Sequence, residues 1–125
     1  MRVIVSGNGL NFLWASMNPA NTELVVSISV PGQPVELARI APPGALLGRD
    51  AKCDISVNEK WVSPRHLQFL IEGERVLLRD VGSANGTYAE GKTFLGFEHP
   101  IQIHEGQRFL VGRHVWLTVQ RLPQG

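Results

Sequence analysis

The apolar residues of this 125-residue chain come in short runs, and most of these runs are bounded by glycine, proline, asparagine or serine. The 13 glycines and 8 prolines are many for a helical protein. In VWLTVQ, residues 115–120, every second residue is Val or Leu, the period typical of a strand with one buried face. No segment of helix length carries a helical period. These features predict an all-β fold.

Strands are predicted wherever an apolar or alternating run lies between two turns. The pair 67–72 and 75–81 is expected to form a hairpin across Gly73. Eleven short strands are expected between residues 23 and 125: 23–30, 35–40, 45–48, 54–57, 67–72, 75–81, 87–89, 92–94, 101–103, 109–111 and 115–119.

Length and composition limit the classes of protein that this chain can belong to. A chain of 125 residues builds one domain with a core that needs neither disulfides nor a metal. Cys53 is the only cysteine, so no internal disulfide forms and a reducing, cytoplasmic location is expected. With four scattered histidines, neither a zinc site nor any other cofactor is expected.

The charge pattern argues against two classes of partner. The formal net charge is +1, and the basic residues are spread along the chain. Binding to nucleic acid or to a membrane surface normally requires a concentrated basic stripe. We therefore expect neither partner.

The first 22 residues are predicted to be an N-terminal extension of a domain that spans 23–125. Residues 2–5 and 10–15 can pair as a hairpin across Ser6-Gly7-Asn8-Gly9. Within residues 1–12 the apolar run, residues 3–5, is too short for a signal peptide or a membrane span. Gly7-Asn8-Gly9 lacks the later Gly, Lys and Ser/Thr of a nucleotide-binding P-loop, so we interpret it as a turn.

Residues suited to holding a phosphate are concentrated in three turns between residues 46 and 87. These are Gly48-Arg49, Ser63-Pro64-Arg65-His66 and Gly82-Ser83-Ala84-Asn85-Gly86-Thr87. Because strands alternate with these turns, all three can meet at one end of a sheet. A phosphomonoester carries nearly two negative charges and three acceptor oxygens, so its receptor needs a fixed cation and several donors.

Three residues are predicted to bind the phosphate itself. Arg49 presents a planar, permanently charged fork of donors, although a surface pair with Asp50 or Asp54 is the alternative. Ser63 offers a hydroxyl and a backbone N–H, although turn-capping serines are common. Arg65 adds a second positive charge, for which contact with solvent alone is an equal alternative.

The residues of the three turns and their order along the chain resemble those of the forkhead-associated (FHA) domain. The resemblance runs from about residue 45 to about residue 120. That family implies a two-sheet β-sandwich of the SMAD/FHA-like type, with about eleven short, mostly antiparallel strands. It also implies a signalling adaptor that binds a Thr-phosphorylated protein or peptide without catalysis.

The resemblance assigns roles to four further residues. It implies that Asn85 reads the main chain of the ligand, since a carboxamide both donates and accepts hydrogen bonds. The alternative is an ordinary Asn-Gly turn. Gly48, His66 and Gly86 are implied to structure the loops, with His66 bracing them without touching the phosphate.

The chain departs from the family pattern at two positions. Glu90-Gly91 stands where a second Asn-Gly is usual, which keeps the turn but changes its side chain. Ala84 stands where a polar residue is common and removes one auxiliary contact. Arg49, Ser63 and Asn85 are all present, so the site is not interpreted as degenerate.

Two other functions are compatible with the residue types. One is a hydrolase with Ser63, His66 and Asp80 as a triad, although residues three apart on a strand point to opposite faces. The other is a structural sandwich for assembly, with Trp14, Trp61 or Trp116 as interface anchors. The sequence does not indicate an oligomeric state.

Overall fold

The computed structural model describes residues 2–6, 22–90, 93–94 and 99–124. Within them the chain forms strands and no α-helix. None of the described segments is a helix long and apolar enough to cross a membrane. The strands are β1 (Arg2–Ser6), β2 (Leu24–Ser29), β3 (Glu36–Ile40), β4 (Gly44–Gly48), β5 (Ile55–Ser56), β6 (Leu67–Glu72), β7 (Arg75–Asp80), β8 (Thr87–Ala89), β9 (Thr93–Phe94), β10 (Ile101–Gln102), β11 (Arg108–Val111) and β12 (Val115–Arg121).

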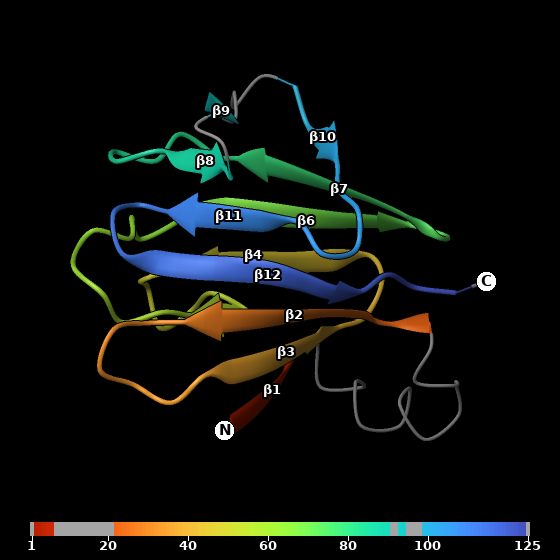
Figure 1. The fold of residues 1–125 in the computed structure, drawn as a ribbon, viewed down its shortest axis with the longest axis horizontal. Coiled ribbons are helices and arrows are strands. Elements are labelled where there is room, and N and C mark those ends of the chain that lie inside the picture. Colours follow the sequence, from red (N-terminus) through yellow and green to blue (C-terminus); the bar gives the residue numbers. More distant parts are fainter. Residues whose placement is uncertain (1, 7–21, 91–92, 95–98, 125) are drawn as a thin grey trace.

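Two sheets form the sandwich. One has seven strands in the order β1-β3-β2-β12-β11-β8-β9, and the other has five in the order β10-β7-β6-β4-β5 (Figure 1). Neighbouring strands are antiparallel except for β1 with β3 and β4 with β5. Each of the eleven segments predicted between residues 23 and 125 forms a strand, and β6 pairs with β7 as the predicted hairpin. The predicted all-β sandwich is confirmed.

The short strand predicted at residues 2–5 is present as β1, but it pairs with a strand that the sequence did not suggest. β1 lies parallel to β3, with Arg2 opposite Glu36 and Ser6 opposite Ile40, and so forms one edge of the seven-stranded sheet. Parallel neighbours need a long connection, so β1 and β3 are joined through β2 and the segment before it. The predicted partner of residues 2–5, the segment 10–15, lies outside the described residues.

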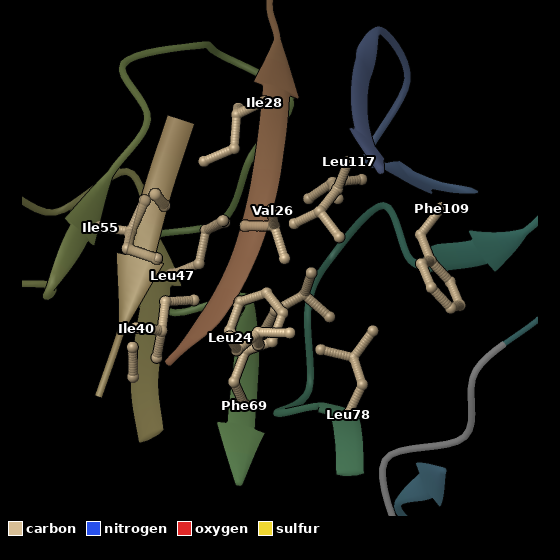
Figure 2. Close-up of a cluster of buried hydrophobic side chains, with 14 of the residues drawn as sticks. Leu24, Val26, Ile28, Ile40, Leu47, Ile55, Phe69, Leu78, Phe109 and Leu117 are labelled. Carbon is tan, nitrogen blue, oxygen red and sulfur yellow. The ribbon is translucent and has the colours of Figure 1, made fainter. Parts of the chain in front are cut away.

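The core lies between the two sheets because alternate residues of each strand point inward. Leu24, Val26 and Ile28 of β2 are almost completely buried, whereas Ser29 is exposed. The same alternation in β12 buries Val115, Leu117 and Val119, as the VWLTVQ pattern predicts. The side chains of the two sheets meet around Phe69, Leu78 and Phe109 (Figure 2).

Strand direction brings five loops to one end of the sandwich. β4 and β7 both run antiparallel to β6, so the ends of β4 and β7 lie beside the start of β6. The segments 49–54, 57–66 and 81–86 therefore share this end. The β2–β3 and β11–β12 connections lie there too, at the left in Figure 1. All three predicted phosphate-binding turns belong to this group.

Candidate functional site

The site is built from three loops: the first is residues 49–54, the second is residues 57–66 and the third is residues 81–86. The main chain of the first loop is hydrogen-bonded to that of the second. The N–H of Arg49 donates to the carbonyl of Ser63 at 2.9 Å, and the N–H of Asp50 donates to that of Pro64 at 3.2 Å. The two loops cross so closely that a Cβ added to Gly48 would lie 2.2 Å from the oxygen of Pro64. Gly48 is therefore required by this close approach, which leaves no room for a side chain.

Arg49 presents an exposed guanidinium at this crossing. Among the residues that the structure describes, its side chain makes no ion pair and no hydrogen bond. The two carboxylates considered as its partners are engaged elsewhere. Asp50 accepts the N–H of Lys52 at 2.9 Å, and Asp54 accepts the N–H of Leu46 at 2.8 Å. The cation is thus available to a ligand.

Arg65, on the second loop, resembles Arg49 in its exposure and in its lack of an ion pair. It is exposed, and within the described part of the chain its side chain has no ion pair. Together with Arg49 it gives this end of the molecule two unneutralised positive charges on adjacent loops. Such a pair favours a dianionic ligand.

Ser63 is half-buried between the second and third loops. Its Oγ accepts the N–H of Ala84 at 2.9 Å, which leaves the hydroxyl proton free to donate. The backbone N–H that we expected Ser63 to offer to an anion is not available, because it donates to Nδ1 of His66 at 3.0 Å. Ser63 therefore has one donor for a ligand, its hydroxyl.

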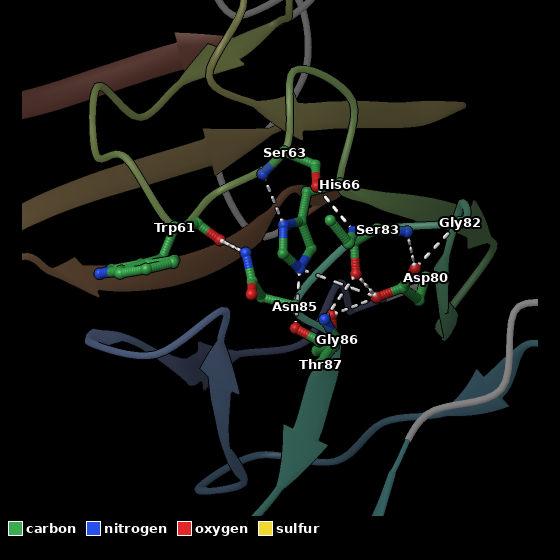
Figure 3. A network of polar contacts seen from close by, with 10 residues as sticks. Trp61, Ser63, His66, Asp80, Gly82, Ser83, Asn85, Gly86 and Thr87 are labelled. Atoms are coloured by element: carbon green, nitrogen blue, oxygen red, sulfur yellow. Dashed lines mark hydrogen bonds and ion pairs between the residues drawn. The ribbon is translucent and has the colours of Figure 1, made fainter.

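His66 is fully buried and connects the second loop to the third (Figure 3). Its Nδ1 accepts from Ser63, and its Nε2 lies 2.9 Å from the carbonyl oxygen of Gly86. This geometry assigns the proton of a neutral imidazole to Nε2. Burial lowers the pKa of His66, although the Gly86 carbonyl and the carboxylate of Asp80 act in the opposite direction.

Asp80 organises the third loop, a role that we did not predict. Its carboxylate accepts from the N–H groups of Gly82 at 2.8 Å and Ser83 at 2.6 Å, and from the hydroxyls of Ser83 at 2.5 Å and Thr87 at 2.8 Å. Burial alone would raise the pKa of Asp80, but these hydrogen bonds lower it below its usual value. The signal in the sequence was Asp80-Val81-Gly82-Ser83 at a strand end, the pattern of an Asp side chain that caps its own turn.

Asn85 lies at the centre of the third loop and faces the second. Its Nδ2 donates to the carbonyl of Trp61 at 3.2 Å, which leaves one amide hydrogen and Oδ1 without a partner among the described residues. Gly86 follows with a φ of +84°, the left-handed conformation expected at an Asn-Gly turn. Part of the carboxamide thus holds the loop and part remains open to a ligand.

Trp61 belongs to the site, although the sequence suggested only a core or interface role. The guanidinium of Arg113 lies 4.1 Å from the centroid of its ring, and Nζ of Lys60 lies 5.2 Å from it. The ring is half-buried. No sequence pattern marks this arrangement, because Trp61 and Arg113 are brought together by separate loops.

The geometry differs from that of a Ser-His-Asp triad. Both ring nitrogens of His66 face main-chain groups, and the imidazole meets the N–H of Ser63 and not its hydroxyl. Asp80 lies 3.7 Å from Nε2, on the side of the ring away from Ser63. A triad needs the serine hydroxyl hydrogen-bonded to one ring nitrogen and the carboxylate hydrogen-bonded to the other, and neither bond is formed between these three residues. The described residues also include no group of His, Cys, Asp or Glu that could hold a metal.

Comparison with models of protein families shows to which family the chain belongs. The family model described as "FHA domain" matches residues 45–112, more than half of the chain. The chain belongs to the FHA family. The matched region contains Arg49, Ser63, Arg65, His66 and Asn85. No curated protein is a significant match to the sequence.

Solved FHA domains have the same fold. An FHA domain from a study of phosphothreonine-dependent interactions has a TM-score of 0.67 at 22% identity, with 80% of this chain and 99% of that one covered. The FHA domain of CT664 from Chlamydia trachomatis has a TM-score of 0.67 at 20% identity, with coverages of 78% and 96%. The N-terminal FHA domain of Rad53p from S. cerevisiae, solved with a phosphothreonine peptide, has a TM-score of 0.64 at 19% identity, with coverages of 78% and 93%. These similarities establish the shared fold.

Proposed function

We propose that this FHA domain is a non-catalytic module that binds a Thr-phosphorylated protein or peptide as a signalling adaptor. The observation that carries the proposal is the exposed guanidinium of Arg49, which has no ion-pair partner among the described residues and whose main-chain N–H is bonded to the carbonyl of Ser63. His66 and Asp80 hold the surrounding loops in place through buried hydrogen bonds. Solved FHA domains that bind phosphothreonine peptides support the same ligand class.

The chemistry of the site matches a phosphate better than a carboxylate. A phosphothreonine carries about −1.5 to −2 charges at neutral pH and three acceptor oxygens. Arg49 can donate two parallel hydrogen bonds, Ser63 donates one, and Arg65 adds charge within the same group of loops. Asn85 then offers a donor and an acceptor to the peptide main chain.

The proposal is tested by titrating two proteins, the wild-type domain and the variant Arg49→Ala. Each is titrated with a phosphothreonine peptide and with the dephosphorylated form of that peptide. Charge-assisted hydrogen bonds contribute roughly 1.5–3 kcal/mol each, so loss of two should abolish measurable binding. Arg75→Ala is the matched control, because Arg75 pairs with Glu72 on the exposed β6–β7 turn. It should bind as the wild type does.

The same titration separates the competing functions. Binding that requires the phosphate excludes a purely structural sandwich. Recovery of the intact phosphopeptide after prolonged incubation excludes a phosphatase or esterase. Equal binding of both peptide forms, or an unchanged Kd in Arg49→Ala, would overturn the assignment.

A further inference from the structure

The outer face of the five-stranded sheet is apolar at its centre. The register of β4, β6 and β7 places Leu46, Leu70 and Leu77 on this face, and all three are half-buried. Each lies in a continuous apolar run, 45–47, 69–71 or 76–78, and the three strands are neighbours in the sheet. Such runs are typical of strands that are covered on both faces, whereas the outer face of an antiparallel sheet is usually polar. The pattern indicates that this face has a partner.

A hollow of about 180 Å³ lies on this face between β4 and β6. Gly44, Leu46 and Leu70 line it, as does Asp54. Gly44 creates the hollow because it brings no side chain to the position opposite Leu70. That position admits only glycine, since an added Cβ would collide with the carbonyl oxygen of Phe69. The backbone thus fixes an apolar recess next to an outward-facing leucine.

Two charged residues border the face at the level of the Leu46–Gln68 pair. Asp54 is exposed and lies beside Leu46, whose N–H its Oδ2 accepts at 2.8 Å. Arg79 lies on the other side, opposite Gln68, and its Nε donates to Oε1 of Gln68 at 2.9 Å. Within the described part of the chain neither Asp54 nor Arg79 makes an ion pair. Oδ1 of Asp54 and the terminal nitrogens of Arg79 are therefore available to a partner.

The hollow, the leucine and the two charges are arranged evenly about a line that runs along the strands, midway between β4 and β6. Gly44 and Leu70 are cross-strand partners, so each lies half a strand spacing from this line. Asp54 lies one strand beyond β4 and Arg79 one strand beyond β6, so each lies about 1.5 spacings, or roughly 7 Å, from it. A two-fold axis above this line brings Leu70 of one copy over Gly44 of the other, and Arg79 over Asp54.

We propose that this face binds a second copy of the chain in a two-fold symmetric dimer. Leu70 of each copy fills the hollow over Gly44 of the other, and two Asp54–Arg79 ion pairs border the interface. A symmetric interface requires a surface that is complementary to itself in this way. Because the axis is parallel to the strands, the loops that carry Arg49 lie at one common end of the dimer and stay uncovered. The dimer goes beyond the proposed phosphopeptide function and does not depend on it.

Analytical ultracentrifugation over a range of concentrations tests the proposal. The wild-type chain should approach twice its monomer mass of 13.8 kDa. Leu70→Asp should stay monomeric across the range, because dimerisation would bury two unpaired carboxylates. Leu37→Asp is the matched control, since Leu37 is a half-buried leucine of β3 in the other sheet, and it should dimerise as the wild type does. Circular dichroism checks that both variants are folded.

An exchange of charges tests the pairing across the interface. Arg79→Asp and Asp54→Arg should each be monomeric alone, because like charges would meet twice in either homodimer. Mixed in equal amounts, the two variants should form a heterodimer in which both pairs attract. Arg75→Asp is the control, because Arg75 pairs with Glu72 near the β6–β7 turn, where the axis brings no charged partner. It should dimerise as the wild type does.

The opposite results overturn the proposal. A wild-type chain that keeps the monomer mass at its highest soluble concentration excludes the dimer, and a dimer that persists in Leu70→Asp excludes this face. Loss of the dimer in Leu37→Asp alone assigns the interface to the seven-stranded sheet. A mixture of the two charge variants that stays monomeric refutes the Asp54–Arg79 pairing. Titration of Arg49→Ala with a phosphopeptide tests the proposed function separately.

Discussion

The imidazole of His66 meets the carbonyl of Gly86 at 2.9 Å across twenty residues of sequence. The same carbonyl accepts the N–H of Gly112 at 2.9 Å, so one buried oxygen connects the second loop, the third loop and the β11–β12 turn. Rigid support of this kind holds donors such as the exposed guanidinium of Arg49 and the half-buried hydroxyl of Ser63 in place before a ligand arrives.

Lowering the pH should destabilise the fold through His66. The unfolded imidazole titrates near its ordinary value of 6.5, whereas burial lowers the pKa of His66 in the folded protein. The unfolded state therefore binds more protons below pH 6.5. The contribution of His66 to the free energy of unfolding is fully present above pH 6.5. It falls as the pH decreases below that value, by at most about 1.4 kcal/mol per pH unit.

Urea unfolding at pH 7.5 and pH 5.5 measures this effect. His66→Ala should be less stable at pH 7.5 by roughly 1–3 kcal/mol, because the N–H of Ser63 loses its acceptor. It should also show a smaller decrease in stability at pH 5.5, and its phosphopeptide binding should weaken only as a consequence of the lost stability. His104→Ala, at an exposed site, should keep the wild-type decrease. An equal decrease in His66→Ala and the wild type would contradict the prediction.

Gly48→Ala should damage both stability and binding. The new methyl group would meet the backbone oxygen of Pro64 at 2.2 Å and force the crossing loops apart, at a cost of roughly 1–3 kcal/mol. Displacement of the Arg49 loop should then weaken phosphopeptide affinity. Thermal denaturation and titration measure the two effects.

Gly73→Ala is the comparison for that variant. Gly73 has a φ of +66° with open space around it, in the β6–β7 turn at the other end of the sandwich. Gly73→Ala should lower the free energy of unfolding by about 1 kcal/mol through backbone strain and leave phosphopeptide binding unchanged. A Gly48→Ala protein that binds as well as Gly73→Ala would show that the close crossing does not position Arg49.

Asn85→Ala should weaken phosphopeptide binding about tenfold or more but barely change the weak affinity for free phosphothreonine. Loss of one peptide contact costs roughly 1–3 kcal/mol, and free phosphothreonine has no flanking chain for the carboxamide to hold. Arg49→Ala should lose both ligands. Titration of both variants with both ligands gives the comparison, with circular dichroism to show that each is folded. Equal weakening of both ligands in Asn85→Ala would make Asn85 a phosphate ligand or a turn residue only.

Phosphothreonine should bind about fourfold more tightly than phosphoserine in otherwise identical peptides. A buried methyl contributes roughly 0.8 kcal/mol, and a β-branched side chain is stiffer before binding. An aspartate at that position should bind poorly, because a planar carboxylate with one charge does not fill a site for a tetrahedral dianion. Calorimetry with the three peptides measures the difference, and equal affinities for the first two would refute it.

The sequence by itself determined the strands and the composition of the loops. Strand formation follows from local alternation and local turn residues, so the eleven predicted segments from 23–30 to 115–119 could be found without knowing their partners. Arg49, Ser63 and Asn85 were identifiable because their order along the chain matches the FHA pattern.

Only the tertiary structure decided how each donor is used. The N–H of Ser63 is occupied by His66, Asp80 builds the third loop, and Trp61 joins the site through Asn85 and Arg113. The parallel pairing of β1 with β3 was equally outside local prediction. These features depend on contacts between residues far apart in sequence, and local propensities carry no information about which backbone groups such contacts will satisfy.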